Sequence, residues 1–352
     1  MKKIAIFQKE LNIGGTETSL INLLNNIDYT KNEVDLYLFE SKNELINDIN
    51  KNVKIFFLEK VPSIYKNKPF FFFNKYKGRI KKQYDLAINY TTICKDTILE
   101  CIKTPAKKRI LWIHTDIDLL MKESHRKRKL IKLLNNKYSF YDKFVMVSNG
   151  IYNSFPKKWL LNKDYAIIPN ILDTKKIDEK LKEPTDINID KKLLNIVCVA
   201  RLDPVKQIDI IIKYLYELKK VRTDFHFYII GDGPERKKLE KLTTKYNLND
   251  NISFLGYRKN PYAIMKDMDA FVLPSRYEGQ GIVFLEAAYL GLDIIMPKHL
   301  EDFVGINIKG SDNILRSLMN LKKKKKKEKY NLDNYNKEII DKFNNLLTEL
   351  EV

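Results

Sequence analysis

The segment from Phe271 to Pro297 has the sequence FVLPSRYEGQGIVFLEAAYLGLDIIMP. Its apolar ends predict two buried strands, and between them the sequence predicts a polar loop and a helix over about Gly281–Leu290. Gly291 stands where the end of a helix favours a residue in the left-handed conformation. Strand, helix and strand in succession form the repeating unit of α/β folds, so the segment predicts a parallel sheet flanked by helices.

Two carboxylates belong to this segment, Glu278 in the loop and Glu286 in the helix, with seven residues between them. Ligands of open α/β sheets bind at the carboxyl ends of the strands, beside helix N-termini that attract anions. A loop carboxylate there can accept hydrogen bonds from a sugar, and a helix carboxylate can accept them from a ribose. The same spacing also fits two solvated glutamates on an amphipathic helix, but the neighbouring Gly279 and Gly281 favour a ligand site.

The length and composition favour an intracellular protein of two domains. The 352 residues, 44% of them apolar, are enough for two domains with separate cores. Cys94, Cys101 and Cys198 form neither a metal-binding spacing nor a disulfide framework, so a reducing cytosol is expected. The formal charge of +19 points to nucleic acid, an anionic membrane surface or an anionic substrate, although the abundance of lysine also indicates compositional bias. No segment reaches the ~18 apolar residues of a membrane-spanning helix.

The first half of the chain alternates expected strands and helices. A strand at Lys3–Gln8 leads through Gly14 and Gly15 to a helix over 16–27, without the spacing of the dinucleotide-binding fingerprint. His114 and Asp116 follow a later strand directly and so belong at the edge of a cleft, where a histidine can bind a ligand or be structural. The later strands are expected at Val34–Phe39, Val53–Leu58, Tyr84–Asn89, Arg109–Ile113 and Phe144–Val147.

Three segments concentrate cations. The first surrounds four consecutive phenylalanines with lysines and an arginine, which fits either an interfacial membrane segment or a core helix with a basic face. The four expected to contact the membrane are Phe70, Phe71, Phe72 and Phe73. The stretch 122–132, KESHRKRKLIK, is expected to be a solvated helix face that can also meet anionic lipid. The six lysines Lys322–Lys327 allow the same two interpretations.

The second half opens after a charged stretch, 174–192, that is the best candidate for a linker. A strand at Leu194–Ala200 then leads to Arg201 and Lys206, which flank a strand-to-helix loop and can both point at an anion over the helix N-terminus. Further along, Gly231-Asp-Gly-Pro234 predicts a tight turn, with Pro234 beginning a helix.

Four motifs in this half resemble those of the retaining family-4 glycosyltransferases, which have the GT-B fold. They are Arg201-x4-Lys206, Gly231-Asp-Gly-Pro234, the turn at Gly256 and Glu278-x7-Glu286. The resemblance extends from Gly14 to Glu286 and implies an α/β fold of two Rossmann-like domains facing across a cleft. Their expected bounds are 1–173 and 193–331, with a C-terminal helix, about 332–352, crossing back to the first domain.

The resemblance also implies roles for single residues. His114 and Glu278 would contact the sugar at the catalytic centre, and Arg201 and Lys206 would clamp the diphosphate, so that no metal or cofactor is needed. The other residues expected to bind the donor are Gly14, Gly15, Gly279, Gly281, Ile282 and Glu286. The chain departs from the family pattern at Ile171, where a glycine is usual, and at Lys298–Phe303, which replaces a glycine-rich segment.

The expected function is transfer of a hexose, with retention of configuration, from a nucleotide-diphosphate sugar. The charge and the segment Phe70–Phe73 suggest a lipid-linked or surface-polysaccharide acceptor, as in capsule, lipopolysaccharide or teichoic acid assembly, and a peripheral position on the cytoplasmic face of the membrane. A nucleotide-sugar epimerase of the same fold is the main alternative. A second alternative, a nucleic-acid-binding protein, is supported only by the positive charge of the chain. A third, a phosphorylase, would need a pyridoxal lysine motif, which we do not find.

Overall fold

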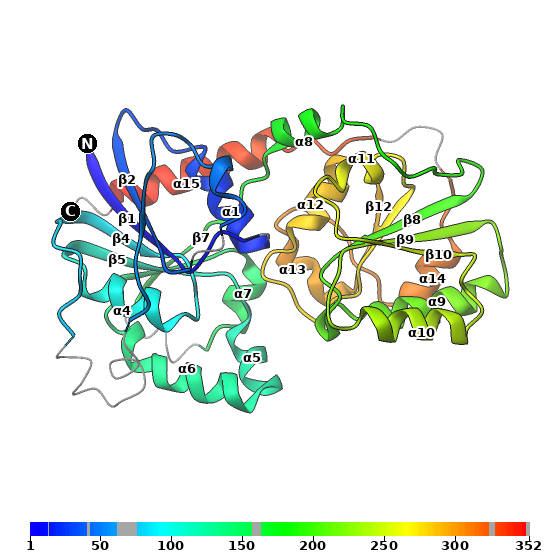
Figure 1. The fold of residues 1–352 in the computed structure, drawn as a ribbon, viewed down its shortest axis with the longest axis horizontal. Helices are drawn as coiled ribbons and strands as arrows, with labels where there is room; N and C mark the ends of the chain where they lie inside the picture. The colour runs from blue at the N-terminus through cyan, green and yellow to red at the C-terminus, as the bar shows by residue number, and fades with distance from the viewer. Residues whose placement is uncertain (13, 41–42, 62–75, 157–162, 324–327, 350–352) are drawn as a thin grey trace. The chain divides into compact units, whose positions relative to one another are not determined.

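A parallel sheet forms the centre of unit 1, which comprises Met1–Ile171 and Asn336–Val352 in the computed structural model (Figure 1). The structure describes residues 1–12, 14–40, 43–61, 76–156, 163–323 and 328–349. The strands follow the order β3-β2-β1-β4-β5-β6-β7, which reverses between β1 and β4. They are β1 (Lys2–Gln8), β2 (Asn32–Leu38), β3 (Lys54–Phe57), β4 (Tyr84–Asn89), β5 (Ala106–Ile113), β6 (Lys143–Met146) and β7 (Asp164–Ile167).

Three of the helices of unit 1 begin at polar caps. Asp116, Ser124 and Ser148 each accept a hydrogen bond from a backbone N–H of the first turn that follows them. The helices are α1 (Gly15–Leu24), α4 (Lys95–Lys103), α5 (Ile117–Glu123), α6 (His125–Tyr138), α7 (Asn149–Ser154) and most of α15 (Asp333–Glu349), with a short turn η1 (Ile46–Asp48).

Unit 2, Leu172–Tyr335, is built on a second parallel sheet, in the order β10-β9-β8-β11-β12. The order reverses between β8 and β11, the topological position at which open α/β sheets bind ligands. In Figure 1, α9, α10 and α14 lie on one face of this sheet and α11 and α12 on the other. The strands are β8 (Leu194–Val199), β9 (Phe225–Ile230), β10 (Ile252–Gly256), β11 (Ala270–Val272) and β12 (Asp293–Ile295).

The core of unit 2 holds α12 firmly on the sheet. Phe271 of β11 and Phe284 of α12 are both fully buried, with ring centroids 5.5 Å apart in an edge-to-face arrangement. Burying each such ring stabilises the fold by about 1.5–3 kcal/mol. The helices and turns of this unit are α8 (Thr174–Lys180), η3 (Pro204–Lys206), α9 (Ile208–Lys219), α10 (Arg236–Lys245), α11 (Tyr262–Met265), α12 (Ile282–Tyr289), η4 (Lys298–Leu300), α13 (Glu301–Val304) and α14 (Ile314–Met319).

Several expected bounds are wrong. The expected linker 174–192 lies inside unit 2 and opens with α8, whose first turn Asp173 caps. The helix expected over 16–27 ends at Leu24, where the Tyr29 hydroxyl donates to the Leu24 carbonyl over 2.6 Å. Pro234 does not begin a helix: it lies in a turn whose Glu235 N–H donates to the Leu202 carbonyl, and α10 starts only at Arg236.

The C-terminal helix α15 begins in unit 2 and belongs to unit 1 from Asn336 onward. Its Phe343 packs on Trp112, with ring centroids 6.1 Å apart, and Glu349 accepts a 2.7 Å hydrogen bond from Lys143. None of the helices among the described residues is long and apolar enough to cross a membrane.

Candidate functional site

The loops after β8 and β11 lie side by side at the carboxyl edge of the sheet of unit 2. Asp203 accepts a hydrogen bond from the Val205 N–H and so shapes the turn η3. The N–H of Arg276, in the loop after β11, donates to the Val205 carbonyl over 2.9 Å. This backbone bond brings the two parts of the predicted site together.

Lys206 and Glu278 meet directly at this edge. The Lys206 Nζ donates to the Glu278 Oε1 over 2.7 Å, and the two side chains are only 21% and 10% exposed. Arg201 is exposed, and within the described part of the chain its guanidinium makes no ion pair. Arg201 is therefore open to an anion, whereas Lys206 is held by the carboxylate 72 residues further along the chain.

Glycine is required where α12 begins. Gly281 has φ +59°, and a Cβ there would lie 2.6 Å from a ring carbon of Phe284. The left-handed backbone turns the chain from the loop into the helix, so that Ile282 becomes its first residue. Gly279 lies in the same loop, directly after Glu278.

Glu286 lies in the middle of α12 and is largely buried. The Tyr262 hydroxyl, from α11, donates to the Glu286 Oε1 over 2.9 Å. Burial raises the pKa of Glu286 to about 6, and the hydrogen bond from Tyr262 opposes that rise. The sequence did not predict the role of Tyr262. Its only local signal is that an aromatic residue follows Pro261 in a turn.

The two glycines of the Gly231-Asp-Gly-Pro234 turn allow a close backbone contact that a side chain would block. A Cβ on Gly231 would lie 1.9 Å from the Ala200 carbonyl oxygen, and one on Gly233 would lie 2.4 Å from the Leu202 carbonyl oxygen. The turn therefore packs backbone against backbone on the loop that carries Arg201. This agrees with the structural interpretation of the motif.

In unit 1, the glycine loop leads from β1 into α1. Gly14 is extended, with φ −174°, and a Cβ on it would lie 2.4 Å from the Glu17 Oε2. No atom lies within 4 Å of the Cβ position of Gly15 among the described residues. Glu17 accepts a 3.2 Å hydrogen bond from Gln8, and burial raises its pKa above the ordinary value.

His114 follows β5, the second neighbour of β1 in the sheet. Its ring packs against Tyr90, with centroids 4.4 Å apart, and its backbone N–H donates to the Thr92 hydroxyl. Burial lowers the pKa of His114 to about 3, so the imidazole is neutral at pH 7. Its Nε2 is buried with no hydrogen-bond partner in the described chain, whereas Asp116, the weaker candidate, is occupied in capping α5.

The residues predicted to bind the donor thus fall into two groups, one in each unit. Unit 2 holds the four charged candidates together with the glycines of their loop, and unit 1 holds the glycine loop and the histidine. The charged candidates of unit 2 are Arg201, Lys206, Glu278 and Glu286, and the candidates of unit 1 are Gly14, Gly15 and His114.

Two segments predicted to meet an anionic surface lie outside the described residues. The first is the run of phenylalanines, so the predicted membrane contact of Phe70, Phe71, Phe72 and Phe73 stays a prediction. The second is most of the lysine run, Lys324–Lys327. Lys323, next to that run, donates to the Leu193 carbonyl over 2.6 Å.

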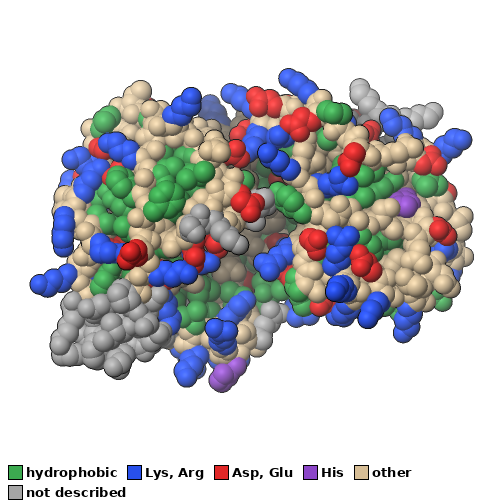
Figure 2. Space-filling model, in the orientation of Figure 1, with side chains coloured by type: hydrophobic (Ala, Val, Ile, Leu, Met, Phe, Trp, Pro, Cys, Tyr) green, Lys and Arg blue, Asp and Glu red, His purple; other side chains and the backbone are tan. Residues whose placement is uncertain are grey.

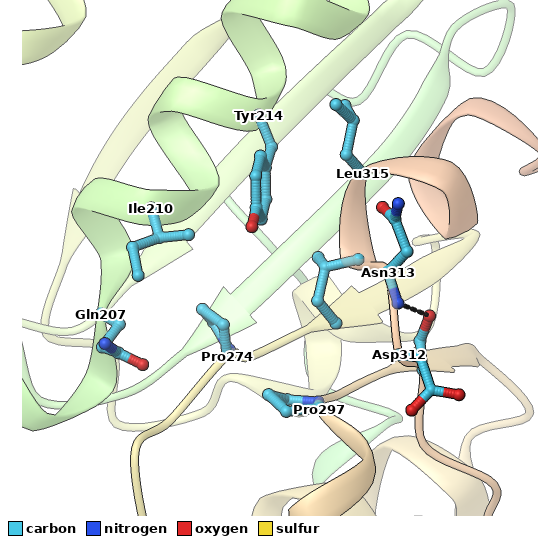
Figure 3. Close-up of a pocket in the computed structure, with 10 residues that line it drawn as sticks. Gln207, Ile210, Tyr214, Pro274, Pro297, Asp312, Asn313 and Leu315 are labelled. Carbon is cyan, nitrogen blue, oxygen red and sulfur yellow. Dashed lines mark hydrogen bonds between the residues drawn. The ribbon is translucent and has the colours of Figure 1, made fainter.

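A separate pocket of about 450 Å³ lies beside this edge of unit 2 (Figure 3). Ile210, Tyr214 and Pro274 form part of its apolar wall, and Gln207 lies at the start of α9, next to Lys206. On the opposite side, Asp312 and Asn313 supply polar groups before α14. The pocket contains none of the residues predicted to bind the donor.

Comparisons with known proteins identify the part of the chain that carries this site. Residues 179–301 match the family described as Glycosyl transferases group 1. An uncharacterized glycosyltransferase of Methanocaldococcus jannaschii is 28% identical over 198 residues, 53% of this chain and 47% of that protein. The O-antigen biosynthesis glycosyltransferase WclY of Escherichia coli is 31% identical over 160 residues, 44% of this chain and 43% of that protein. The chain thus spans less than half the length of these two relatives.

A solved structure, that of Anabaena Alr3699/HepE in complex with UDP and glucose, resembles the whole fold. Its TM-score is 0.66 at 18% identity, over 91% of this chain and 88% of that one. The expected α/β fold of the GT-B type is therefore confirmed. Residues 179–301, the part of the chain that matches the glycosyl transferases group 1 family, include Arg201, Lys206, Glu278 and Glu286.

Proposed function

We propose that the protein is a retaining glycosyltransferase that moves a hexose from a nucleotide-diphosphate sugar to a lipid-linked or surface-polysaccharide acceptor. The observation that carries this proposal is the pairing of Lys206 with Glu278 over 2.7 Å, inside the segment that matches the family. Lys206 can bind a diphosphate and Glu278 can bind sugar hydroxyls, and both lie at one edge of the sheet. Glu286 and Tyr262 lie nearby on α12 and α11.

Each residue has a chemical role in the proposed reaction. The bond from the sugar C1 to the diphosphate oxygen breaks, and a bond from C1 to the acceptor oxygen forms on the same face. Arg201 and Lys206 neutralise the charge that builds up on the departing diphosphate, and the departing phosphate takes the acceptor proton. No metal ion is needed for this step. Glu278 accepts hydrogen bonds from the sugar, Glu286 from the ribose, and the neutral His114 imidazole contacts the sugar.

The proposed acceptor class draws support from a relative and from the charge of the chain. The Escherichia coli relative is named for O-antigen biosynthesis, and O-antigen is a surface polysaccharide. The formal charge of +19 favours binding to an anionic membrane surface. We therefore propose a peripheral position on the cytoplasmic face of the membrane, and assembly of capsule, lipopolysaccharide or teichoic acid as the process served.

A thermal-shift panel of nucleotide sugars and nucleoside diphosphates tests the donor. A ligand that binds only the folded protein stabilises it by ~2.7 kcal/mol at a hundred times its dissociation constant. We expect one nucleotide series to raise the melting temperature, and Arg201→Gln to reduce that rise. A folded sample that no nucleotide stabilises would contradict the proposal. Hydrolysis of the nucleotide sugar with no transfer to any acceptor would favour the epimerase alternative.

Donor binding is expected to depend on pH through Glu286. Only the charged carboxylate accepts two ribose hydroxyls fully, so affinity should rise with pH through about 6, the pKa of this group. In Tyr262→Phe the carboxylate loses a hydrogen bond that favours its charged form, and the midpoint should move up by about one pH unit. Titration of the nucleoside diphosphate dissociation constant from pH 5 to 8 measures this, with Tyr330→Phe, at an exposed site, as the control. A midpoint that stays in place in Tyr262→Phe would argue against the role of Tyr262.

A further inference from the structure

The helix α6 carries cations and no acidic side chain. Its sequence, HRKRKLIKLLNNKY, includes six lysines and arginines. Arg126, Lys127, Arg128, Lys129 and Lys132 are all exposed. Figure 2 shows lysine and arginine side chains gathered on the part of unit 1 where α6 lies in Figure 1.

Among the described residues, none of these five cations is paired with a carboxylate, whereas several cations elsewhere in the chain are. Lys54, Lys122 and Arg236, for example, each lie within 3.2 Å of a carboxylate oxygen. Within the described part of the chain, Arg126, Lys127, Lys129 and Lys132 form no ion pair, and the Arg128 Nε donates to the Met121 carbonyl. Like charges one turn apart destabilise a helix by about 0.2–0.5 kcal/mol a pair. An anionic partner would relieve this repulsion.

The helix is held so that the basic face points outward. Ile131, Leu134 and Tyr138 are buried, at positions three and four residues apart that define one face. At its start, the Ser124 hydroxyl accepts a hydrogen bond from the Lys127 N–H over 3.2 Å. Lys129 and Lys132 lie on the opposite face, so the packing that fixes α6 leaves these charges in solvent.

We propose that the exposed face of α6 docks unit 1 onto an anionic lipid bilayer. A helix of 14 residues is about 21 Å long, and such a length can lie along a flat surface of lipid phosphates. Each lysine or arginine near such a surface strengthens binding by about fivefold. A bilayer is favoured over nucleic acid because the proposed function, on which this choice rests, includes a peripheral position on the cytoplasmic face of the membrane.

Two matched variants of the full-length chain test the proposal. The first, Lys127→Gln/Lys129→Gln/Lys132→Gln, removes three charges from α6 and keeps Arg128 and its bond to Met121. The second, Lys237→Gln/Lys241→Gln/Lys245→Gln, removes from α10 of unit 2 three lysines that are also exposed and form no ion pair with any described residue. Sedimentation with vesicles of phosphatidylcholine containing 30% phosphatidylglycerol, at low salt, measures binding, and vesicles of pure phosphatidylcholine test the charge requirement.

We expect the α6 variant to bind anionic vesicles about a hundredfold more weakly than the unaltered protein, and the α10 variant to lose much less. Equal losses in both variants would mean that net charge, rather than α6, carries the binding, and would overturn the proposal. So would no binding by the unaltered protein, or binding to duplex DNA in preference to vesicles. Nucleotide-induced thermal shifts in the same variants should be unchanged, so failure of the docking and failure of the proposed enzyme function are separable.

Discussion

Replacing Lys206 by methionine is expected to lower the rate of sugar transfer by about a hundred- to a thousandfold while the protein stays folded. Lys206 is the cation that lies closest to Glu278, at 2.7 Å, and in the proposed reaction it faces the charge that grows on the departing diphosphate. Methionine keeps the length of the side chain but supplies no charge. Lys206→Arg should keep more of the rate than methionine does, because the charge remains although its geometry changes. Single-turnover rates at saturating donor would measure the loss.

The same substitution should also reduce stability, since it leaves the mostly buried Glu278 carboxylate without its partner. We expect a loss of about 1–3 kcal/mol from urea unfolding. The double variant Lys206→Met/Glu278→Gln should regain most of this stability but none of the activity. Lys213→Met is the control, because Lys213 pairs with Asp209 on the exposed surface of α9 and should contribute less than about 1 kcal/mol. Full activity in Lys206→Met would contradict the proposed clamp.

Much of the fold could be predicted because the signals are local. The strand Tyr84–Asn89 has the predicted bounds, and β8 differs from its predicted range by one residue, since each is an apolar run with a clear end. The left-handed glycine at Gly291, with φ +76°, follows from the need to end a helix abruptly. β7 was not predicted as such, because Asp164 and Tyr165 are exposed and the strand lacks a continuous apolar run.

The contacts of the site were harder to predict because they join distant parts of the chain. Lys206 and Glu278 were both proposed for the donor, but their ion pair depends on β8 and β11 being neighbours in the sheet. Tyr262 reaches Glu286 across 24 residues, from a helix of only four residues whose short length leaves no periodic pattern. Asp116 was expected at the edge of a cleft, and the hydrogen bond that it accepts from the Leu119 N–H shows that it caps α5.

Glu286→Gln is expected to lose transfer activity and gain stability at the same time. The substitution removes the charge that would accept the ribose hydroxyls, so donor affinity and the rate of transfer should fall by about ten- to a hundredfold, from a loss of roughly 1.5–3 kcal/mol. Glu286→Ala should abolish most transfer as well. Glutamine keeps the shape of the side chain and can still accept the Tyr262 hydrogen bond, so the fold around α12 should be unchanged.

The gain in stability follows from the raised pKa of Glu286. Burial moves this pKa from 4.5 to about 6, so the folded protein binds the proton more tightly than the unfolded chain. Stability therefore falls as pH rises between these two values, and above pH 6 the charged carboxylate costs about 2 kcal/mol. Glutamine has no such cost, so the variant should be the more stable protein at pH 7.5, and its advantage should disappear near pH 4. Glu217→Gln, at an exposed site on α9, should change neither quantity, and a Glu286→Gln variant that is less stable at pH 7.5 would show that the carboxylate is structural. Opposite changes in activity and stability are expected where a residue is kept for binding rather than for folding.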